Sequence, residues 1–236
     1  MKKMIVLLAG LFIGIISNAQ ISDPNVQVRE AKDFHGIHVA SAFDVYLTQG
    51  NEEKVAVSAS QEKYLQYITV EMKNGELYVG WDHRKGKMGT GNKKLKAYIS
   101  FKSINKLSAG GACNVDIIGS LKADNITINL SGASDLEGNL DANKVFIELS
   151  GASDAKLKGT VPQLKIEASG ASSFKGYDLI TDVCNANASG ASDIKITVNK
   201  EISAEASGAS DIHYKGSGTT RDVKASGASS VSKTGS

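Results

Sequence analysis

The chain has 236 residues, with 24 glycines, only two prolines, two cysteines and a formal net charge of +2 at pH 7. Removing Lys2 and Lys3, the only charges in the first 19 residues, leaves 25 basic residues that balance the 25 acids. A neutral chain lacks the electrostatic footprint of nucleic-acid binding or of general attraction to anionic membranes, so neither function class is expected.

Residues 1–19 are predicted to be a secretory signal peptide. Two lysines form a positive n-region, residues 4–16 are apolar and uncharged, and Ser17-Asn18-Ala19 supplies the small residues of a cleavage site. The apolar stretch is too short to cross roughly 30 Å of hydrocarbon as an anchor, and no later stretch reaches membrane length. We therefore expect an exported protein, periplasmic or secreted, that is cleaved after Ala19 and has no membrane span.

Residues 20–105 are predicted to be rich in β-strands but irregular. Runs in which apolar and polar residues alternate indicate strands with one buried face. These runs centre on Val26/Val28, Ile37/Val39, Phe43/Val45/Leu47, Val55/Val57, Ile68/Val70, Leu77/Val79 and Ala97/Ile99/Phe101. Asn74-Gly75 predicts a hairpin between two of them, and residues 61–67 have room for one helical turn. We expect either irregular early coils or an antiparallel cap that shields sheet edges.

A basic, glycine-rich segment interrupts this region between residues 83 and 94. Its candidate ligand-binding residues are the cations Arg84, Lys85, Lys87, Lys93 and Lys94. The segment lacks the GxxxxGK[ST] and GxGxxG phosphate-binding patterns, and no helix pattern follows it, so a solvated hairpin loop is the expected structure. An anionic glycan or a lipopolysaccharide phosphate is the ligand that these cations would suit.

Residues 106–236 form a repeat. Gly-Ala recurs with glycines at positions 111, 132, 151, 170, 190, 208 and 227, separated by 18 to 21 residues, and six of the seven corners read Ser-Gly-Ala-Ser. Apolar residues stand two and four positions before each glycine and four positions after it. This alternation predicts a buried strand on each side of a Gly-Ala corner, where glycine permits a sharp bend.

A single repeat cannot bury its own apolar face, but stacked repeats can. We therefore predict an all-β fold, a single-stranded parallel β-helix with coils of about 19 residues that is right-handed by the usual chirality of parallel crossovers. The predicted organisation is a signal peptide (1–19), an irregular β region or cap (20–105) and β-helix repeats (106–236).

The repeat also places the two cysteines. Cys184 lies in an apolar column six residues before its glycine, and Cys113 lies in a column otherwise occupied by serine. The two are three to four coils apart at about 4.8 Å per coil, which exceeds the ~7 Å between Cα atoms that a disulfide allows. Both thiols are therefore expected to be free. Arg221 is expected to break the Cys184 column, and with Lys233 to give the polar last coil that caps a solenoid core.

Several motifs resemble one known family. These are residues 34–39 (FHGIHV), 43–50 (FDVYLTQG) and 76–79 (ELYV), together with the Leu-Ser-Gly-Ala-Ser-Asp repeats. They are similar to the family called "putative auto-transporter adhesin, head GIN domain", over nearly the whole chain after residue 33. The resemblance implies an exported β-helical protein of Bacteroidetes-like bacteria, and it transfers no catalytic residue.

Polar residues form columns beside the Gly-Ala corners. Three residues after the corner glycines stand the acids Asp135, Asp154, Asp193 and Asp211. In a functional interpretation, this column of carboxylates binds calcium or the hydroxyl groups of a sugar. Turn chemistry is the favoured explanation, because exposed carboxylates on adjacent coils repel by only about 1 kcal/mol in water and need no metal between them. We therefore predict no metal and no cofactor, with these four aspartates as the candidates if a metal binds.

The serine columns and the four histidines do not form a catalytic pattern. No serine has a histidine and an aspartate at a predictable spacing, and the histidines are dispersed without ligand spacing. Stacked serine hydroxyls are expected to hydrogen-bond along the coils. No catalytic residue is therefore predicted.

The sequence favours a non-enzymatic envelope module with a binding or structural role, adhesin-like binding included. Its partner would be an envelope or extracellular glycan or another envelope protein, and the oligomeric state does not follow from the sequence. The alternative is a polysaccharide-active enzyme on a β-helix scaffold. An enzyme needs clustered carboxylates beside aromatic platforms, whereas aromatic residues make up 6% of this chain and stand mostly before residue 105.

Overall fold

The computed structural model describes residues 23, 25–86 and 93–235. The predicted signal peptide and Lys87 lie outside the described residues. Among the described residues, no helix is long and apolar enough to cross a membrane.

The described chain is built almost entirely from strands. In chain order the elements are β1 (Val26–Arg29), β2 (Gly36–Ala40), β3 (Phe43–Gln49), β4 (Lys54–Ser58), the 3-10 helix η1 (Glu62–Tyr67), β5 (Ile68–Lys73), β6 (Glu76–Trp81), β7 (Leu95–Phe101), β8 (Lys106–Gly110), β9 (Asn114–Leu130), β10 (Asp135–Leu149), β11 (Asp154–Thr160), β12 (Gln163–Ala168), β13 (Ser173–Ala188), β14 (Asp193–Gly208), β15 (Asp211–Lys215), β16 (Thr219–Gly227) and β17 (Ser230–Lys233). All seven strands expected in residues 20–105 are present, as are the helical turn and the hairpin at Asn74-Gly75.

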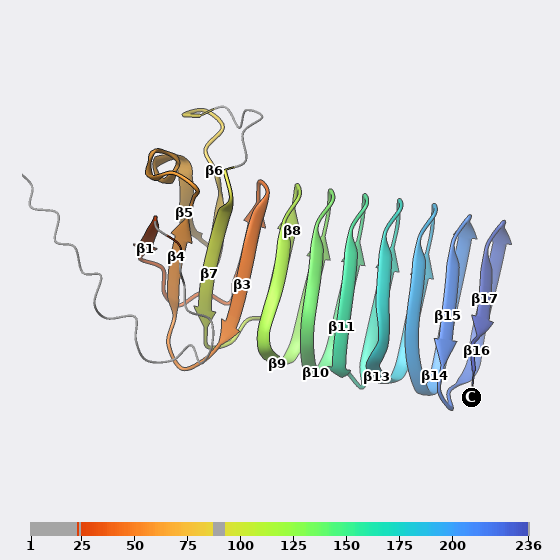
Figure 1. Ribbon diagram of the computed structural model, residues 1–236. Helices are drawn as coiled ribbons and strands as arrows, with labels where there is room; N and C mark the ends of the chain where they lie inside the picture. The colour runs from red at the N-terminus through yellow and green to blue at the C-terminus, as the bar shows by residue number, and fades with distance from the viewer. Residues whose placement is uncertain (1–22, 24, 87–92, 236) are drawn as a thin grey trace, which may run out of the picture.

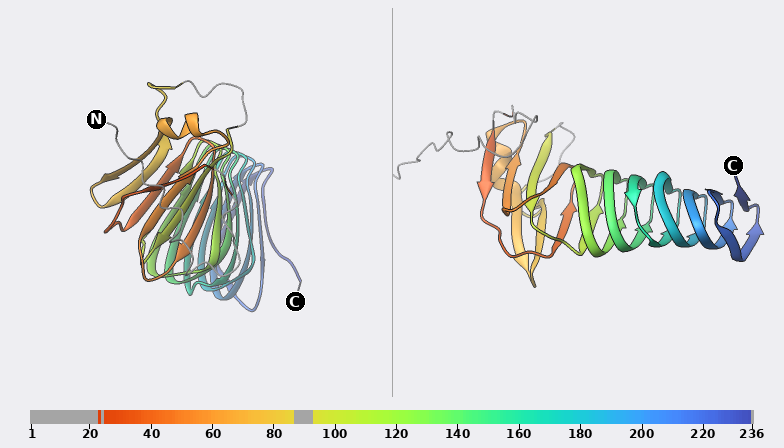
Figure 2. Two further views of the ribbon diagram at one scale, coloured as in Figure 1. Left: turned by 60° about the vertical axis from the view of Figure 1, so that its left-hand side comes forward. Right: turned by 90° about the horizontal axis from the view of Figure 1, so that it is seen from below.

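From β8 onward the strands form a parallel solenoid, which confirms the predicted fold. Each strand pairs with its equivalent one coil away, so that Val115 lies opposite Leu136 and Ile128 opposite Ile147. These inward columns are almost completely buried and form one continuous core. The coils stand side by side with their narrow Gly-Ala corners along one edge (Figure 1), and they wind about a common axis (Figure 2).

The corners depend on glycine for two reasons. Gly132, Gly151 and Gly170 have positive φ angles of +76°, +76° and +77°, a conformation that disfavours residues with a Cβ atom. The corners also stack closely, because the N–H of Ala152 donates a 2.7 Å hydrogen bond to the carbonyl oxygen of Gly132. A Cβ atom at Gly151 would lie 2.4 Å from that same oxygen. Backbone conformation and coil spacing therefore both select glycine.

The order of coils in space differs from their order in the sequence. β2 and β3 form a complete coil that pairs in parallel with β8 and β9 on one side and with β6 and β7 on the other. β3 accordingly lies between β7 and β9 (Figure 1). Beyond this, β5 pairs antiparallel with β6, β4 with β7 and β1 with β4. The N-terminal region therefore combines parallel coil strands with antiparallel strands.

The β2–β3 coil turns at a corner without glycine. Ser41 and Ala42 take the place of Gly-Ala and have φ angles of 78° and 60°. A left-handed conformation costs a residue with a Cβ atom about 1–2 kcal/mol, whereas the added freedom of glycine in the unfolded chain costs about 0.5–1 kcal/mol.

Ser41→Gly is therefore expected to stabilise the protein by about 0.5–1 kcal/mol. In a chain of this size, that gain raises the melting temperature by about 1–4 °C in a thermal unfolding scan. The matched control is Ala40→Gly at the end of β2, outside the positive-φ corner, which is expected to lower the melting temperature. A fall with Ser41→Gly would show instead that the contact of its hydroxyl with His83 (3.4 Å) matters more than the backbone strain.

Both cysteines are free and buried, as predicted. Cys184 lies in its expected column between Leu164 and Ile202, and burial raises the pKa of its thiol to about 12. The Cys113 thiol donates to the carbonyl of Gly110 at 3.3 Å, the same turn contact that the Ser134 hydroxyl makes with Ser131. Cysteine therefore replaces serine in this column without loss of the turn hydrogen bond.

The predicted position of Arg221 is wrong. A β-bulge in β16 places Thr220 opposite Ile202 and Asp222 opposite Ser203, so Arg221 falls out of the Cys184 column. Its guanidinium instead contacts Glu201 at 3.1 Å. One extra residue in a strand is enough to shift a column, and spacing alone does not reveal it.

Candidate functional site

The solenoid presents two long walls to solvent. The pre-corner wall consists of β2, β6, β8, β12, β16 and the C-terminal parts of β9, β10, β13 and β14. The post-corner wall consists of β3, β7, β11, β15, β17 and the N-terminal parts of β9, β10, β13 and β14. Because side chains alternate along a strand, every second residue of each wall points outward and stacks with its equivalents.

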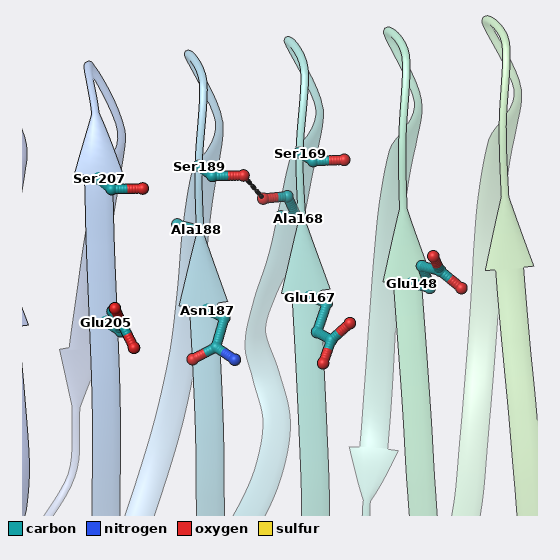
Figure 3. A pocket seen from close by; sticks show the side chains of 9 residues that line it. All are labelled: Glu148, Glu167, Ala168, Ser169, Asn187, Ala188, Ser189, Glu205 and Ser207. Carbon is teal, nitrogen blue, oxygen red and sulfur yellow. Dashed lines mark hydrogen bonds between the residues drawn. The ribbon is translucent and has the colours of Figure 1, made fainter.

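A shallow groove of about 390 Å³ runs along the pre-corner wall. One side is a row of carboxylates and an amide in register across successive coils, and the other side is a row of serines (Figure 3). The first row is Glu148, Glu167, Asn187 and Glu205, and the second is Ser169, Ser189 and Ser207. The groove exists because the serines next to the corners are short while the residues of the facing row are long.

Hydrogen bonds hold two of the serines, and an ion pair holds one carboxylate of the facing row. The hydroxyls of Ser169 and Ser189 donate to carbonyls of the preceding coil at 3.3 and 3.5 Å. Glu167 pairs with Lys165 at 2.7 Å, and the ammonium group of Lys165 lies 4.9 Å from the ring centre of Phe146. The groove thus combines carboxylates, one amide and serine hydroxyl groups, a set that suits a ligand rich in hydroxyl groups.

The carboxylate row continues toward the N-terminal cap. Register pairs extend it through Asn129 and Ser108 to His38 and Tyr78. The rings of His38 and Tyr78 stack with centroids 4.4 Å apart. Beside them Glu76 accepts hydrogen bonds from Lys106, Tyr78 and His38, and the first of these contacts contributes most to holding the pKa of Glu76 at about 2. The wall therefore offers polar groups over most of the solenoid's length.

The four candidate aspartates do form a column on the post-corner wall. Asp135 lies opposite Asp154 and Asp193 opposite Asp211, with Ser173 between the two pairs. Asp154 pairs with Lys175 at 3.2 Å and Asp193 with Lys195 at 2.6 Å. Within the described ranges, no group of three or more His, Cys, Asp or Glu side chains is placed to hold a metal ion.

The turn hydrogen bonds come from the serine column one position before these aspartates. The hydroxyls of Ser153 and Ser210 donate to carbonyls three residues earlier, at 2.7 and 2.8 Å. Ser210 also donates to Ala188 of the preceding coil at 3.0 Å. The serine hydroxyls therefore bond to backbone carbonyls of their own turn and of the neighbouring coil.

Three of the candidate cations in the described part of the basic loop, Arg84, Lys85 and Lys93, contact the body of the cap. Arg84 and Lys85 each approach the largely buried carboxylate of Asp82 at 3.5 Å. Lys93 lies over the rings of Tyr64 and Trp81, at 5.5 and 5.8 Å from their centres, and Lys94 has a positive φ of 43°. The side chain of Arg84 is 92% exposed and that of Lys85 is 71% exposed.

A second constellation, on the post-corner wall, escaped the sequence analysis. Tyr46, Asp116 and Glu137 lie side by side on three successive coils, and the ring of Tyr46 stacks on Tyr98 with centroids 5.1 Å apart. Burial, Glu137 and Asp44 raise the pKa of Asp116, whereas hydrogen bonding from Lys156 lowers the pKa of Glu137. The signal that could have revealed it is the Ser41-Ala42 corner, which puts Tyr46 in the same column as Glu137.

A family model described as "Putative auto-transporter adhesin, head GIN domain" matches residues 33–218. A crystal structure of a "putative adhesin" from Bacteroides fragilis has 24% identity and a TM-score of 0.81, covering 89% of this chain and 96% of that one. A "Putative lipid binding protein" from Parabacteroides distasonis has 18% identity and a TM-score of 0.71, covering 91% and 98%. A "putative adhesin" from Parabacteroides merdae has 15% identity and a TM-score of 0.65, covering 90% and 97%. No curated protein matches the chain.

Proposed function

Because the chain belongs to the family described as "Putative auto-transporter adhesin, head GIN domain", we propose that it is a non-enzymatic binding module of the cell envelope whose ligand is a glycan. The supporting observation is the groove on the pre-corner wall, which repeats its carboxylate, amide and serine groups from coil to coil. A repeating row of acceptors and hydroxyls suits a repeating, hydroxyl-rich polymer. A neutral mature chain also suits a ligand recognised through hydrogen bonds rather than through net charge.

A glycan array followed by calorimetric titration of the best ligand tests this proposal. The double variant Glu167→Ala/Asn187→Ala removes two neighbouring groups of the carboxylate and amide row from the middle of the groove. Each lost hydrogen bond is worth about 0.5–1.5 kcal/mol, so we expect affinity to fall about tenfold or more. Asp154→Asn on the post-corner wall is the matched control and is expected to leave affinity unchanged.

Two results would contradict the glycan proposal. In the first, Asp154→Asn weakens binding as much as the groove variant does, which would move the site to the other wall. In the second, no glycan binds but phospholipid vesicles do, which would transfer to this chain the activity named for the Parabacteroides distasonis structure.

The protein is also proposed to be exported with removal of its signal peptide. We expect the protein from periplasm or culture medium to begin at Gln20, because a signal peptidase would cut after the small residue Ala19. Intact-mass spectrometry of the natively expressed protein measures the mass lost. An inner-membrane protein that still carries Met1 would contradict this assignment.

Polysaccharide cleavage is the second candidate function, and the constellation around Asp116 favours it. Retaining glycosidases hold two carboxyl groups about 5–5.5 Å apart, close to the ~4.8 Å between neighbouring coils. Asp116, with its raised pKa, would be the acid, Glu137 the nucleophile and Tyr46 the sugar platform. A reducing-end release assay that gives activity in the wild type and none in Glu137→Gln would establish this function in place of simple binding.

A further inference from the structure

The C-terminal end of the solenoid is an open end. β16 and β17 pair with β14 and β15 of the preceding coil, and no strand pairs with their outer edges among the described residues. The apolar core is exposed here. Val223 is 42% exposed, whereas Ile147 and Ala204 in the same inward column are 0% and 3% exposed. An exposed apolar edge of this kind is a site for pairing with another chain.

The backbone of this edge is ready to form hydrogen bonds. In β17, the N–H of Ser230 points back to Ser210, and the N–H of Thr234 points back to Tyr214. Because successive residues of a strand point their N–H groups to opposite sides, the N–H and C=O of Val231 face the open end. The same alternation applies to β16. Thr127 occupies the position in its own coil that Asp222 occupies in the last coil, and the N–H of Thr127 donates to Asn105 of the preceding coil. The N–H of Asp222 therefore also points toward the preceding coil. Val223 therefore also presents its N–H and C=O to the open end.

The charged residues of β16 would complement those of a second copy of β16. If two copies of β16 pair antiparallel about Val223, each Asp222 lies opposite Lys224 of the other copy, and Val223 lies opposite Val223. Directly opposite residues share a face of the sheet, and Asp222 and Lys224 both point outward. Their 3.5 Å contact within one chain shows that their charged groups already approach each other on that face.

The second wall accepts the same symmetry. Val223 stands four residues before the corner Gly227 and Val231 four residues after it, so both valines lie at the same height on their walls. A single two-fold axis perpendicular to the walls can therefore pass near both valines. The axis that pairs β16 with β16 of the second copy then also pairs β17 with β17 of that copy. The opposite end of the solenoid bears the antiparallel strands β4 and β5 and also β1 (Figure 1). That end does not offer a parallel coil on which a second copy could stack head to tail.

From this geometry we propose that the C-terminal coil is a homodimer interface. Two copies join end to end about a two-fold axis, β16 and β17 each pair antiparallel with their own copies, and the two apolar cores become one. Closed two-fold pairing uses the same patch on both partners, so the assembly stops at two. The dimer places its two pre-corner walls in line.

Charge exchange across the proposed axis tests the interface by sedimentation analysis of the purified protein at micromolar concentrations. The wild type is expected to be a dimer. Asp222→Lys opposes lysine to lysine at both symmetry-related pairs, and Lys224→Asp opposes aspartate to aspartate. Each single variant is expected to weaken dimerisation by about tenfold or more. The double variant Asp222→Lys/Lys224→Asp restores opposite charges and is expected to restore the dimer.

Mixing the two single variants provides the sharpest outcome, since every pair then joins lysine with aspartate and a heterodimer is expected. Lys144→Asp, an exposed charge reversal in the central coils, is the control and should remain dimeric. Circular dichroism checks that each variant is folded. A monomeric wild type, an assembly larger than a dimer, a double variant that stays monomeric or a folded Lys144→Asp monomer would overturn the proposal.

Discussion

Gly151→Val is expected to unfold at a much lower urea concentration than the wild-type protein. A side chain at the observed φ of +76° brings backbone strain of about 1–3 kcal/mol. Its Cβ atom would also lie 2.4 Å from the carbonyl oxygen of Gly132, and overpacking of this kind costs about 1–3 kcal/mol more. Domains of this kind have a total stability of about 5–15 kcal/mol, so the loss is a large fraction of it.

Two glycine-to-alanine variants separate strain from collision. Gly119 also has a positive φ, of +85°, but a Cβ atom there would have no neighbour within 4 Å. Gly119→Ala is therefore expected to show the conformational cost alone, about 1–2 kcal/mol, and Gly151→Ala to cost clearly more. Equal urea midpoints for the two would mean that neighbouring corners move apart freely, and a wild-type midpoint for Gly151→Val would contradict the corner geometry itself.

Asp154→Asn, only three residues from Gly151, provides a chemical control. Its carboxylate is exposed and contacts Lys175 at 3.2 Å, and exposed ion pairs contribute about 0–1 kcal/mol. We expect its urea midpoint to lie close to that of the wild type. A calcium-dependent rise in melting temperature that Asp154→Asn abolishes would instead show that the aspartate column binds metal.

Acid is expected to weaken the N-terminal cap through Glu76. Its carboxylate is 17% exposed and accepts hydrogen bonds from His38 at 2.7 Å and Lys106 at 3.1 Å, and its folded-state pKa is lowered from 4.5 to about 2, chiefly by the bond from Lys106. A lowered pKa means that the carboxylate stabilises the fold fully above the unfolded-state pKa and that this stability is lost as the pH falls through the folded-state pKa. The shift corresponds to roughly 3 kcal/mol, which is lost progressively as the pH falls from about 5 to below 2.

Glu76→Gln tests this directly because it keeps the shape of the side chain and removes the charge. The variant is expected to be less stable than the wild type by roughly 3 kcal/mol at pH 7, and the difference should shrink to a small fraction of this at pH 2, where about half of the wild-type Glu76 carboxyl groups are protonated. Urea unfolding at the two pH values measures it. Glu71→Gln, whose carboxylate is 49% exposed beside Lys73, is the control, and its urea midpoint is expected to stay close to that of the wild type at both pH values. An equal deficit at both pH values would mean that Glu76 acts through packing alone.

Local pattern was sufficient for the regular half of the molecule. The Gly-Ala period predicted the coils, their corners and the buried columns, and it placed Cys113 and Cys184 where the structure has them. It succeeded because each coil contacts only its neighbours, so the sequence of one repeat constrains its packing almost completely. The Asn74-Gly75 hairpin was equally predictable, since a two-residue turn requires those residue types.

The candidate sites were less predictable because they combine residues that are distant in the sequence. The groove became visible only when Glu148, Glu167 and Asn187 were seen in register on one wall. Tyr46 and Asp116 are 70 residues apart but adjacent in space. In the sequence, the acids after the corners form one column and the aromatic residues stand mostly before residue 105, so nothing in the local pattern indicates that Tyr46 neighbours Asp116 and Glu137.

The sequence by itself determined that this chain forms a parallel solenoid with glycine corners, because alternation and repeat length leave few ways to bury the apolar faces. Only the tertiary structure decided the order of the first coils, in which β2 and β3 insert between later strands. It also decided the bulge at Arg221 and the exposure of Val223 at the last coil. These features depend on strand pairing between distant segments, and alternation reveals which face of a strand is buried but not which strand lies beside it.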